Sequence, residues 1–486
     1  MRFHVVLNAI GQVLKYFSIL MLLPVIFALS YGEISHIMPF AVALIVSIAF
    51  GFLFSIKKTE IKEMNDVKKS EALGIVFLSW LLIGLICTIP YKMFNLSFVD
   101  SMFESFSGIT TTGATILTNY ALYPKTLFFY RALTQWIGGM GIIVLFIGVL
   151  PQFAVAGRQM FYAEVPGPVE EKLTPRIRQT AIRLWGVYIS LTLMEVILLM
   201  TIGKMNFYYA ICASFSTLSS GGFMPNATGF MAFMNYKVHW IVTIFMFLTG
   251  CNYVLLYKTF IQRKFKSIVQ NEEFWIYLGI ICIASMIVAV IITKNTDLTP
   301  YVAITNAFFT ITSAITSTGN VDVNYNLWNI DAKIILFAVM LIGGCATSTS
   351  GGIKVTRWIF IFKYLRSEIV KIIHPNAVAP IKLSGNTVQQ NVALQLVAFA
   401  CFYVAILGIS SFVVCLIERD PVAALIGSTT TLGNIGLTLG HTLSSHHGFE
   451  SLTDATKLIF TFDMLIGRLE LIPFLALLHP DAWKKG

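Results

Sequence analysis

Long, almost uncharged apolar runs recur along this sequence. Two of them read LGIVFLSWLLIGLICTIP at 73–90 and FWIYLGIICIASMIVAVIIT at 274–293. A helix needs about 20 apolar residues to cross the hydrocarbon core of a bilayer, and both runs have that length. Only 12% of the 486 residues are charged, whereas soluble domains have about 25%. We therefore predict an integral membrane protein and not a soluble enzyme, in which so much apolar surface would cause aggregation.

The same reasoning, applied to the whole chain, predicts ten membrane-spanning helices. They are expected near 6–31, 36–56, 71–90, 128–150, 180–202, 236–260, 273–293, 332–365, 388–417 and 456–478. Four further apolar segments are too short to cross, near 99–111, 206–218, 301–316 and 421–432. The first span follows Arg2 as a signal peptide would, but it has no clear small-residue cleavage site, so we expect it to be retained.

Basic residues gather in alternate loops of this topology. The basic segments are 57–69, 157–183, 258–266, 354–382 and the C-terminal Lys484 and Lys485. The positive-inside rule places these segments and both termini in the cytoplasm, as expected of a multi-pass protein of the inner membrane. Because this asymmetry explains the net charge of +10, we expect the lipid bilayer as the partner of the chain and no nucleic acid.

The four short outer segments repeat one pattern. They read MFESFSGITTTGATI (102–116), ICASFSTLSSGGFMP (211–225), FFTITSAITSTGNVD (308–322) and LIGSTTTLGNIGLTL (425–439). In each, a hydroxyl-rich apolar stretch leads to a glycine, and these glycines are 109, 97 and 117 residues apart. Each interval contains the second spanning helix of one unit and the first spanning helix of the next, which indicates an internal repeat.

The expected fold is an all-α polytopic membrane protein in which four parallel repeats surround one pore with pseudo-fourfold symmetry. Each repeat consists of a spanning helix, a short helix with its turn, and a second spanning helix. Two extra transmembrane helices precede the first repeat. The predicted domains are an N-terminal pair of helices at 1–70 and pore repeats at 71–156, 157–270, 271–386 and 387–486.

Four non-helical turns at membrane depth indicate an ion pathway. Such backbone is tolerated only where it is buried in protein or lines a water-filled cavity. A ring of backbone carbonyls can replace the hydration shell of a small cation, and glycine reaches the backbone angles that aim successive carbonyls one way. The alternative is four ordinary outer loops with glycine as helix breaker. The predicted filter consists of Thr111, Thr112, Gly113, Ser220, Gly221, Gly222, Ser317, Thr318, Gly319, Asn434, Ile435 and Gly436.

A second unusual stretch, IGGCATSTSGGIKVTRW at 342–358, interrupts the expected eighth span. Its spacing does not match a nucleotide-binding P-loop. One interpretation is a kink where helices pack closely through small residues. The other is a flexible segment below the filter that opens and closes the pore, since broken helices are tolerated where they line a cavity. The candidate gate residues are Gly343, Gly344, Ala346, Thr347, Ser348, Thr349, Ser350, Gly351, Gly352, Lys354 and Arg468.

Arg468 lies within the last expected span, in FDMLIGRLELIPF. A charge at membrane depth is costly and usually faces the protein interior with a partner. Arg468 therefore either forms a structural ion pair with Asp463 or Glu470, or sets a barrier to cations just below the filter. Near the outer mouth, Asp100 and Glu104 either concentrate cations or are solvated rim charges.

The motifs SGITTTGAT, STLSSGGF, GGCATSTSGGIKV (343–355) and MLIGRLE (464–470) resemble those of the potassium transporter superfamily of Trk, Ktr and plant HKT proteins. The two extra N-terminal spans make the chain look most like the TrkH family within it. The resemblance covers nearly the whole chain. It implies K⁺ as the transported ion, bound at the filter residues, because glycine at the position of Gly113 goes with potassium selectivity and serine with sodium permeability.

The resemblance also implies how the pore is controlled. It assigns the 342–358 segment to an intramembrane gating loop and Arg468 to a pore arginine. It further implies a homodimer and a cytosolic TrkA-type regulatory subunit that binds NAD(H) and ATP or ADP, with no cofactor in this chain. Asn434 departs from the family pattern, since it stands where the other turns have a hydroxyl.

Two other function classes remain as alternatives. An ion-coupled secondary carrier, driven by H⁺ or Na⁺, would bind its substrate on broken helices near the midplane. A Na⁺-permeable relative of the same superfamily is the second. A membrane enzyme is disfavoured, because no Ser/His/Asp set or metal-spaced cluster is found in the sequence.

Overall fold

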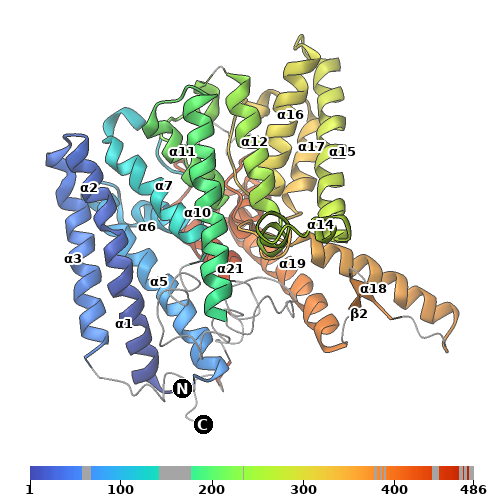
Figure 1. The fold of residues 1–486 in the computed structure, drawn as a ribbon, viewed down its shortest axis with the longest axis horizontal. Helices are drawn as coiled ribbons and strands as arrows, with labels where there is room; N and C mark the ends of the chain where they lie inside the picture. Colours follow the sequence, from blue (N-terminus) through green and yellow to red (C-terminus); the bar gives the residue numbers. More distant parts are fainter. Residues whose placement is uncertain are drawn as a thin grey trace.

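The computed structural model describes residues 1–56, 67–141, 177–233, 235–376, 380–383, 386–387, 390–439, 448–469, 474 and 479–480. These residues are mostly helical, and their strands are the short β1 (Lys382–Leu383) and β2 (Asn386–Thr387), which pair antiparallel. The predicted all-α class is confirmed. Figure 1 shows the helices as a bundle that runs from the blue N-terminal helices on one side to α18 and β2 on the other.

An N-terminal group of helices flanks the bundle. It comprises α1 (Phe3–Leu20), α2 (Leu22–Ser30), the 3₁₀ turn η1 (Ile34–His36) and α3 (Ile37–Phe54). α1 and α3 pack closely because both carry a glycine at the contact: a β-carbon built on Gly11 would lie 2.8 Å from the Gly51 oxygen. An ion pair of 2.8 Å between Arg2 and Glu71 ties the start of α1 to the start of the next helix.

Four similar units follow along the chain. The first contains α5 (Lys69–Met93), the short α6 (Phe98–Ile109), η2 (Tyr120–Leu122) and α7 (Lys125–Gly139). The second contains α10 (Ile177–Thr201), the short α11 (Phe207–Ser219), η4 (Gly229–Ala232), α12 (Tyr236–Gly250), α13 (Tyr253–Leu256), η5 (Tyr257–Ile261) and α14 (Lys266–Val269).

The third unit contains α15 (Glu272–Asn295), the short α16 (Pro300–Ile315), η6 (Tyr325–Leu327), α17 (Ile330–Met340) and α18 (Val355–Ile373). The fourth contains α19 (Gln390–Glu418), the short α20 (Pro421–Leu432) and α21 (Asp454–Leu469). We call α6, α11, α16 and α20 the pore helices, because each leads into one of the four glycine turns.

Each pore helix has a local start signal in the sequence. Ser97 and Asn206 accept hydrogen bonds from backbone amides at the starts of α6 and α11. Asp420 does the same for two amides of α20, which has proline at its first position. Thr299 precedes Pro300 at the start of α16. Such caps satisfy amides that have no partner within the helix, and proline fits the first helical position.

The spans differ in part from the ten that were expected. Six described helices are long and apolar enough to cross a membrane, and α12 together with the segment Tyr253–Ile261 would add a seventh that is bent by 103°. The expected spans at 128–150 and 332–365 do not continue as single helices, because α7 ends at Gly139 and α17 ends at Met340. The second helices of the first three units, α7, α12 and α17, therefore end at or near a glycine where they meet the pore helices.

Candidate ion filter and gate

The four pore helices end in the same backbone motif. In the first turn, the amide of Thr112 donates to the Ser107 oxygen at 2.9 Å, and the amide of Thr111 donates to the Gly108 oxygen at 3.0 Å. The same two bonds close the turns at 220–221, 317–318 and 434–435. The first residue of each pair has a left-handed backbone, with φ of 58°, 57°, 50° and 49° for Thr111, Ser220, Ser317 and Asn434. This pattern is the Schellman helix cap.

Asn434 fits this motif for a physical reason. Asparagine tolerates left-handed backbone better than most residues with side chains. Its side-chain amide donates to the Thr112 hydroxyl and to the Met464 oxygen, both at 2.9 Å. The departure of the fourth turn from the hydroxyl pattern therefore leaves the geometry of the turn unchanged, and Asn434 links the fourth turn to the first.

The four glycines close a ring. Each has a positive φ, between 73° for Gly319 and 81° for Gly222. A β-carbon built on Gly113 would lie 2.0 Å from the Gly221 oxygen of the second turn. A β-carbon on Gly222 would lie 2.3 Å from the Thr318 backbone oxygen of the third turn. One on Gly319 would lie 2.2 Å from the Ile435 oxygen of the fourth turn, and one on Gly436 would lie 2.2 Å from the Thr112 oxygen of the first. The contacts run from the first turn to the second, third, fourth and back to the first, so the four turns surround one axis.

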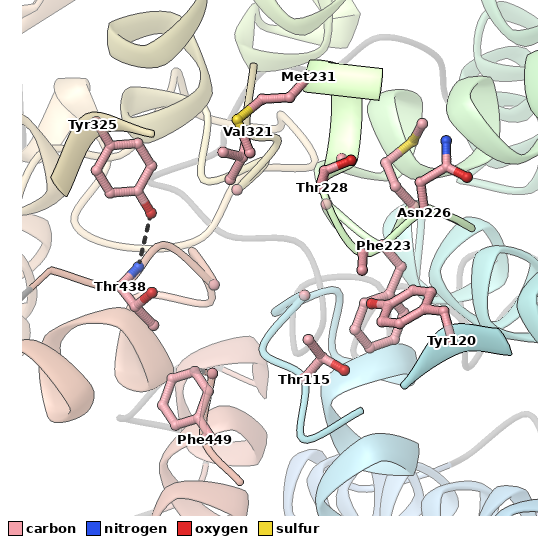
Figure 2. A pocket seen from close by; sticks show the side chains of 18 residues that line it. Thr115, Tyr120, Phe223, Asn226, Thr228, Met231, Val321, Tyr325, Thr438 and Phe449 are labelled. Atoms are coloured by element: carbon pink, nitrogen blue, oxygen red, sulfur yellow. Dashed lines mark hydrogen bonds between the residues drawn. The ribbon is translucent and has the colours of Figure 1, made fainter. Parts of the chain in front are cut away.

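A hollow opens on one side of this ring. Its volume is about 100 Å³, and Gly113, Gly222, Gly319 and Gly436 all line it. Figure 2 shows the side chains around it, which come from the segments that follow the four turns. Among them, the Tyr325 hydroxyl accepts a hydrogen bond of 3.3 Å from the Thr438 amide and joins the third and fourth units across the rim.

The hydroxyl groups of the turns mostly hold the backbone in place. Ser107 donates to the Ala114 oxygen at 2.6 Å, and Ser313 donates to the Asn320 oxygen at 2.8 Å. The Thr112 hydroxyl lies 2.8 Å from that of Thr110. The Thr318 hydroxyl lies 2.7 Å from that of Thr316. The described contacts of these hydroxyls therefore support the backbone of the turns.

The segment at 341–354, which we call the intramembrane loop, lies on the other side of the ring. It joins α17 to α18 as a loop, so the interpretation as a kink in one helix is wrong. The Thr349 hydroxyl lies 2.8 Å from that of Ser220, and the Gly351 amide donates to the Ser317 hydroxyl at 2.6 Å. A β-carbon on Gly351 would lie 2.2 Å from the Gly433 oxygen. The loop therefore contacts three of the four turns before their glycines, opposite the hollow.

The loop is anchored at its base and along its length. The Gly343 amide donates to the Ile353 oxygen at 2.8 Å, which joins the two ends. The Ala346 amide donates to the Glu273 carboxylate at 2.6 Å. The buried Lys354 ammonium donates to the Ser350 oxygen and lies 3.4 Å from the Ser348 hydroxyl. Thr347 donates to the Asn252 side chain at 2.7 Å, while Gly344 and Gly352 complete the turns of the base.

Arg468 connects this loop to the first unit. Its guanidinium donates to the Thr349 oxygen at 2.8 Å, to the Gly138 oxygen at 2.5 Å and to the Gly139 oxygen at 2.6 Å. Of the two acids considered as partners of Arg468, Asp463 accepts a hydrogen bond from the Ser410 hydroxyl. Glu470 lies outside the described residues. The charge of Arg468 thus lies on the loop side of the ring, among backbone carbonyls.

The two acidic residues that the sequence assigns to the outer mouth are not free rim charges. Glu104 is fully buried and forms an ion pair of 3.0 Å with Arg131. Its other oxygen accepts the Ile116 amide at 2.7 Å, so the pair supports the chain just after the first turn. Asp100 pairs with Lys457 at 2.7 Å. Both expectations for Glu104 were wrong. Its partner Arg131 lies on α7, and the spacing of the two residues along the sequence does not predict their contact.

Breaking the Glu104–Arg131 pair is expected to destabilise the protein strongly. The substitution Glu104→Gln leaves a buried guanidinium without its counter-charge, which costs about 3–5 kcal/mol. The matched control is Glu368→Gln, since the side chains of Glu368 and its partner Lys371 are 41% and 45% exposed and exposed pairs contribute about 0–1 kcal/mol. Thermal unfolding of the purified variants in detergent measures both. Equal losses in the two variants would contradict this role of the pair.

The comparisons with known proteins agree on one family. The family model for TrkH, described as a cation transport protein, matches residues 36–483. The Trk system potassium uptake protein TrkH of Escherichia coli strain K12 is 32% identical over 490 residues, covering 100% of both chains. Its namesake from Vibrio parahaemolyticus is 33% identical over 496 residues with the same coverage. The crystal structure of the potassium transporter TrkH from Vibrio parahaemolyticus matches with a TM-score of 0.89 and 30% identity over 100% of each chain.

Proposed function

This chain belongs to the TrkH family of cation transport proteins, and on that premise we propose that it takes up K⁺ across the cytoplasmic membrane. Its curated relatives are named as potassium uptake proteins. The observation that carries the proposal is the closed ring of four glycines, each against a carbonyl oxygen of the next turn. Carbonyl oxygens arranged around one axis replace the hydration shell of K⁺.

The K⁺ site is a backbone site in this proposal. Among the described residues, no group of three His, Cys, Asp or Glu side chains is placed to hold a metal ion. Hard monovalent cations bind carbonyl and hydroxyl oxygens, which the turns at 111–113, 220–222, 317–319 and 434–436 supply. K⁺ is the cargo, and the protein is a transporter and not an enzyme. The four pore repeats and the N-terminal pair act as one unit in the inner membrane, with both termini in the cytoplasm.

The intramembrane loop and Arg468 act as the gate below the ring. The loop touches three of the four turns on the side away from the hollow. An ion that has passed the ring meets this loop and the positive charge of Arg468 before it reaches the cytosol. Regulation is proposed to come from a cytosolic TrkA-type subunit that binds NAD(H) and ATP or ADP, acting on a homodimer of this chain. The basic segments assigned to the cytoplasmic side suit contact with such a subunit.

Replacing Arg468 by alanine is expected to raise K⁺ flux by about tenfold. A tenfold rise corresponds to a barrier that is lower by about 1.4 kcal/mol, a size expected for the removal of a unit charge beside an ion path at an effective dielectric of about 20. The variant also loses the bonds that hold Thr349 against α7. Arg468→Lys keeps the charge and is the matched control, with flux close to that of the wild type. A loss of flux in a folded Arg468→Ala protein would show that Arg468 is structural.

Ion flux into liposomes that hold the purified chain tests the function. The proposal expects K⁺ to enter down its own gradient much faster than Na⁺, without movement of protons. If the chain is an ion-coupled carrier, K⁺ enters only with an H⁺ or Na⁺ gradient. If it is a sodium-permeable relative, both cations enter equally. A pH-sensitive dye inside the liposomes separates these outcomes, because only the H⁺-coupled carrier acidifies the interior as K⁺ enters.

A further inference from the structure

One motif recurs at the C-terminal ends of α7, α12, α17 and α21 and differs in one unit. The segments read QWIGG from Gln135, MFLTG from Met246, MLIGG from Met340 and MLIGR from Met464. In this alignment the first unit has glutamine where the other three have methionine. The Gln135 side chain is fully buried. A buried polar group in place of an apolar one costs free energy unless its hydrogen bonds are satisfied, so Gln135 needs a structural reason.

Gln135 bonds to the backbone of the second turn. Its side-chain amide Nε2 donates to the Gly221 oxygen at 2.6 Å, and its Oε1 accepts the Phe223 amide at 3.0 Å. The orientation of the amide is fixed by chemistry, because a backbone N–H only donates and therefore faces the oxygen. The two bonds span Gly222, the ring glycine of this turn, from the α7 side.

The second turn lacks the internal support that two other turns have. In the first and third turns, a threonine before the glycine bonds to a threonine two residues earlier, as in Thr318 with Thr316. The second turn has Gly221 and Ser219 at these positions, and the Ser219 hydroxyl donates to the Ser216 oxygen. A β-carbon on Gly221 would lie 2.4 Å from the Gln135 side chain. Gln135 thus occupies the space of the missing side chain and supports the turn through its backbone instead.

We propose that Gln135 is a positioning residue that sets the ion selectivity of the filter by holding the Gly221 carbonyl. This carbonyl faces Gly113 in the ring, so its direction determines one side of the proposed ion site. A carbonyl that is held by a neutral donor keeps its place when a smaller ion would pull it inward. The inference rests on the proposed K⁺ transport and adds that selectivity depends on a side chain outside the four turns.

The substitution Gln135→Met tests this role, because methionine is the residue that three units already use. We expect the ratio of K⁺ to Na⁺ flux to fall by about tenfold, as for the loss of a buried hydrogen bond. Gln135→Glu keeps the shape but places a carboxylate against the Gly221 oxygen, so a similar or larger fall is expected. Gln270→Met, at an exposed position, is the control for the change of residue type.

A rescue variant separates positioning from general stability. Combining Gln135→Met with Ser219→Thr and Gly221→Thr rebuilds the second turn on the pattern of the third, where Thr316, Thr318 and Met246 occur together. This triple variant is expected to recover most of the K⁺ over Na⁺ preference lost by Gln135→Met. Thermal unfolding in detergent identifies any variant that has lost its fold.

The outcomes distinguish the inference from the function on which it rests. If wild type prefers K⁺ and folded Gln135→Met keeps the same ratio, the role of Gln135 is wrong while the filter stands. A uniform loss of flux for both ions, with the ratio unchanged, likewise contradicts a role in selectivity. If wild type itself shows no preference for K⁺, the proposed function fails.

Discussion

Serine in place of Gly113 is expected to remove most of the preference for K⁺ over Na⁺. Gly113 has a φ of 77°, a conformation that costs a residue with a side chain about 1–3 kcal/mol. The new β-carbon would also lie 2.0 Å from the Gly221 oxygen, so that the first or second turn must move. A displaced carbonyl no longer surrounds an ion of fixed size, and we expect the ratio of K⁺ to Na⁺ flux in liposomes to fall by at least about tenfold.

The matched control is a glycine that the structure leaves unconstrained. Gly186 on α10 has no atom within 4 Å of a built β-carbon, so Gly186→Ser adds the same hydroxymethyl group without a clash. Its flux ratio is expected to equal that of the wild type. A Gly113→Ser protein that is folded and still prefers K⁺ as strongly as the wild type would contradict the filter.

Deleting residues 346–350 from the intramembrane loop is expected to raise K⁺ flux more than any single substitution. The deleted stretch includes Thr349, which contacts Ser220 under the second turn and accepts a bond from Arg468. The shortened chain can close, because Gly343 and Gly351 already approach closely: a β-carbon on Gly343 would lie 2.3 Å from the Gly351 oxygen. We expect an increase in flux of about tenfold or more in liposomes, as for a barrier lowered by at least about 1.4 kcal/mol.

The ion selectivity of the deletion variant is its internal control. The ring of glycines is closed by contacts among the four turns themselves, and of the described contacts with these turns the deletion removes only that of Thr349 with Ser220, so the preference for K⁺ is expected to persist while the rate rises. A rise in flux that is equal for K⁺ and Na⁺ would mean that the filter itself has collapsed. Unchanged K⁺ flux in a folded variant would show that the loop does not close the pore.

The sequence predicted the four turns better than the contacts that surround them. The four turns were found because each is a local signal, in which a short apolar helix leads to hydroxyl groups and a glycine. The loop after Gly343 was recognised for the same reason. Such signals depend on backbone conformation within a few residues, which sequence patterns report directly. The structure then brought the four turns together through the contacts of Gly113, Gly222, Gly319 and Gly436.

Contacts between distant residues were predicted less well. Arg468 bonds to Gly138, 330 residues away, whereas the sequence offered only nearby acids as structural partners. Glu104 was assigned to the outer rim, although Arg131 neutralises it in the interior. Gln135 was missed entirely, yet a signal existed in the aligned motif, where glutamine replaces methionine in one unit of four. Comparing all four second helices would have found it.

Hydropathy along the sequence also did not predict where the second helices end. The runs at 128–150 and 332–365 are apolar enough to suggest continuous spans, but glycine allows the second helix to approach the end of a pore helix. A β-carbon on Gly138 would lie 1.8 Å from the Ile109 oxygen, and one on Gly467 would lie 2.1 Å from the Leu432 oxygen. Hydropathy measures the preference for lipid and does not report such close packing within the protein.

Locating a bound ion tests the central claim most directly. Rb⁺ is close to K⁺ in size and scatters X-rays anomalously, so crystals of the protein grown in Rb⁺ can report the ion position. The four-turn filter predicts an anomalous peak on the axis enclosed by Gly113, Gly222, Gly319 and Gly436. An empty axis, with Rb⁺ bound instead among the broken second helices, would contradict the filter and favour the ion-coupled carrier.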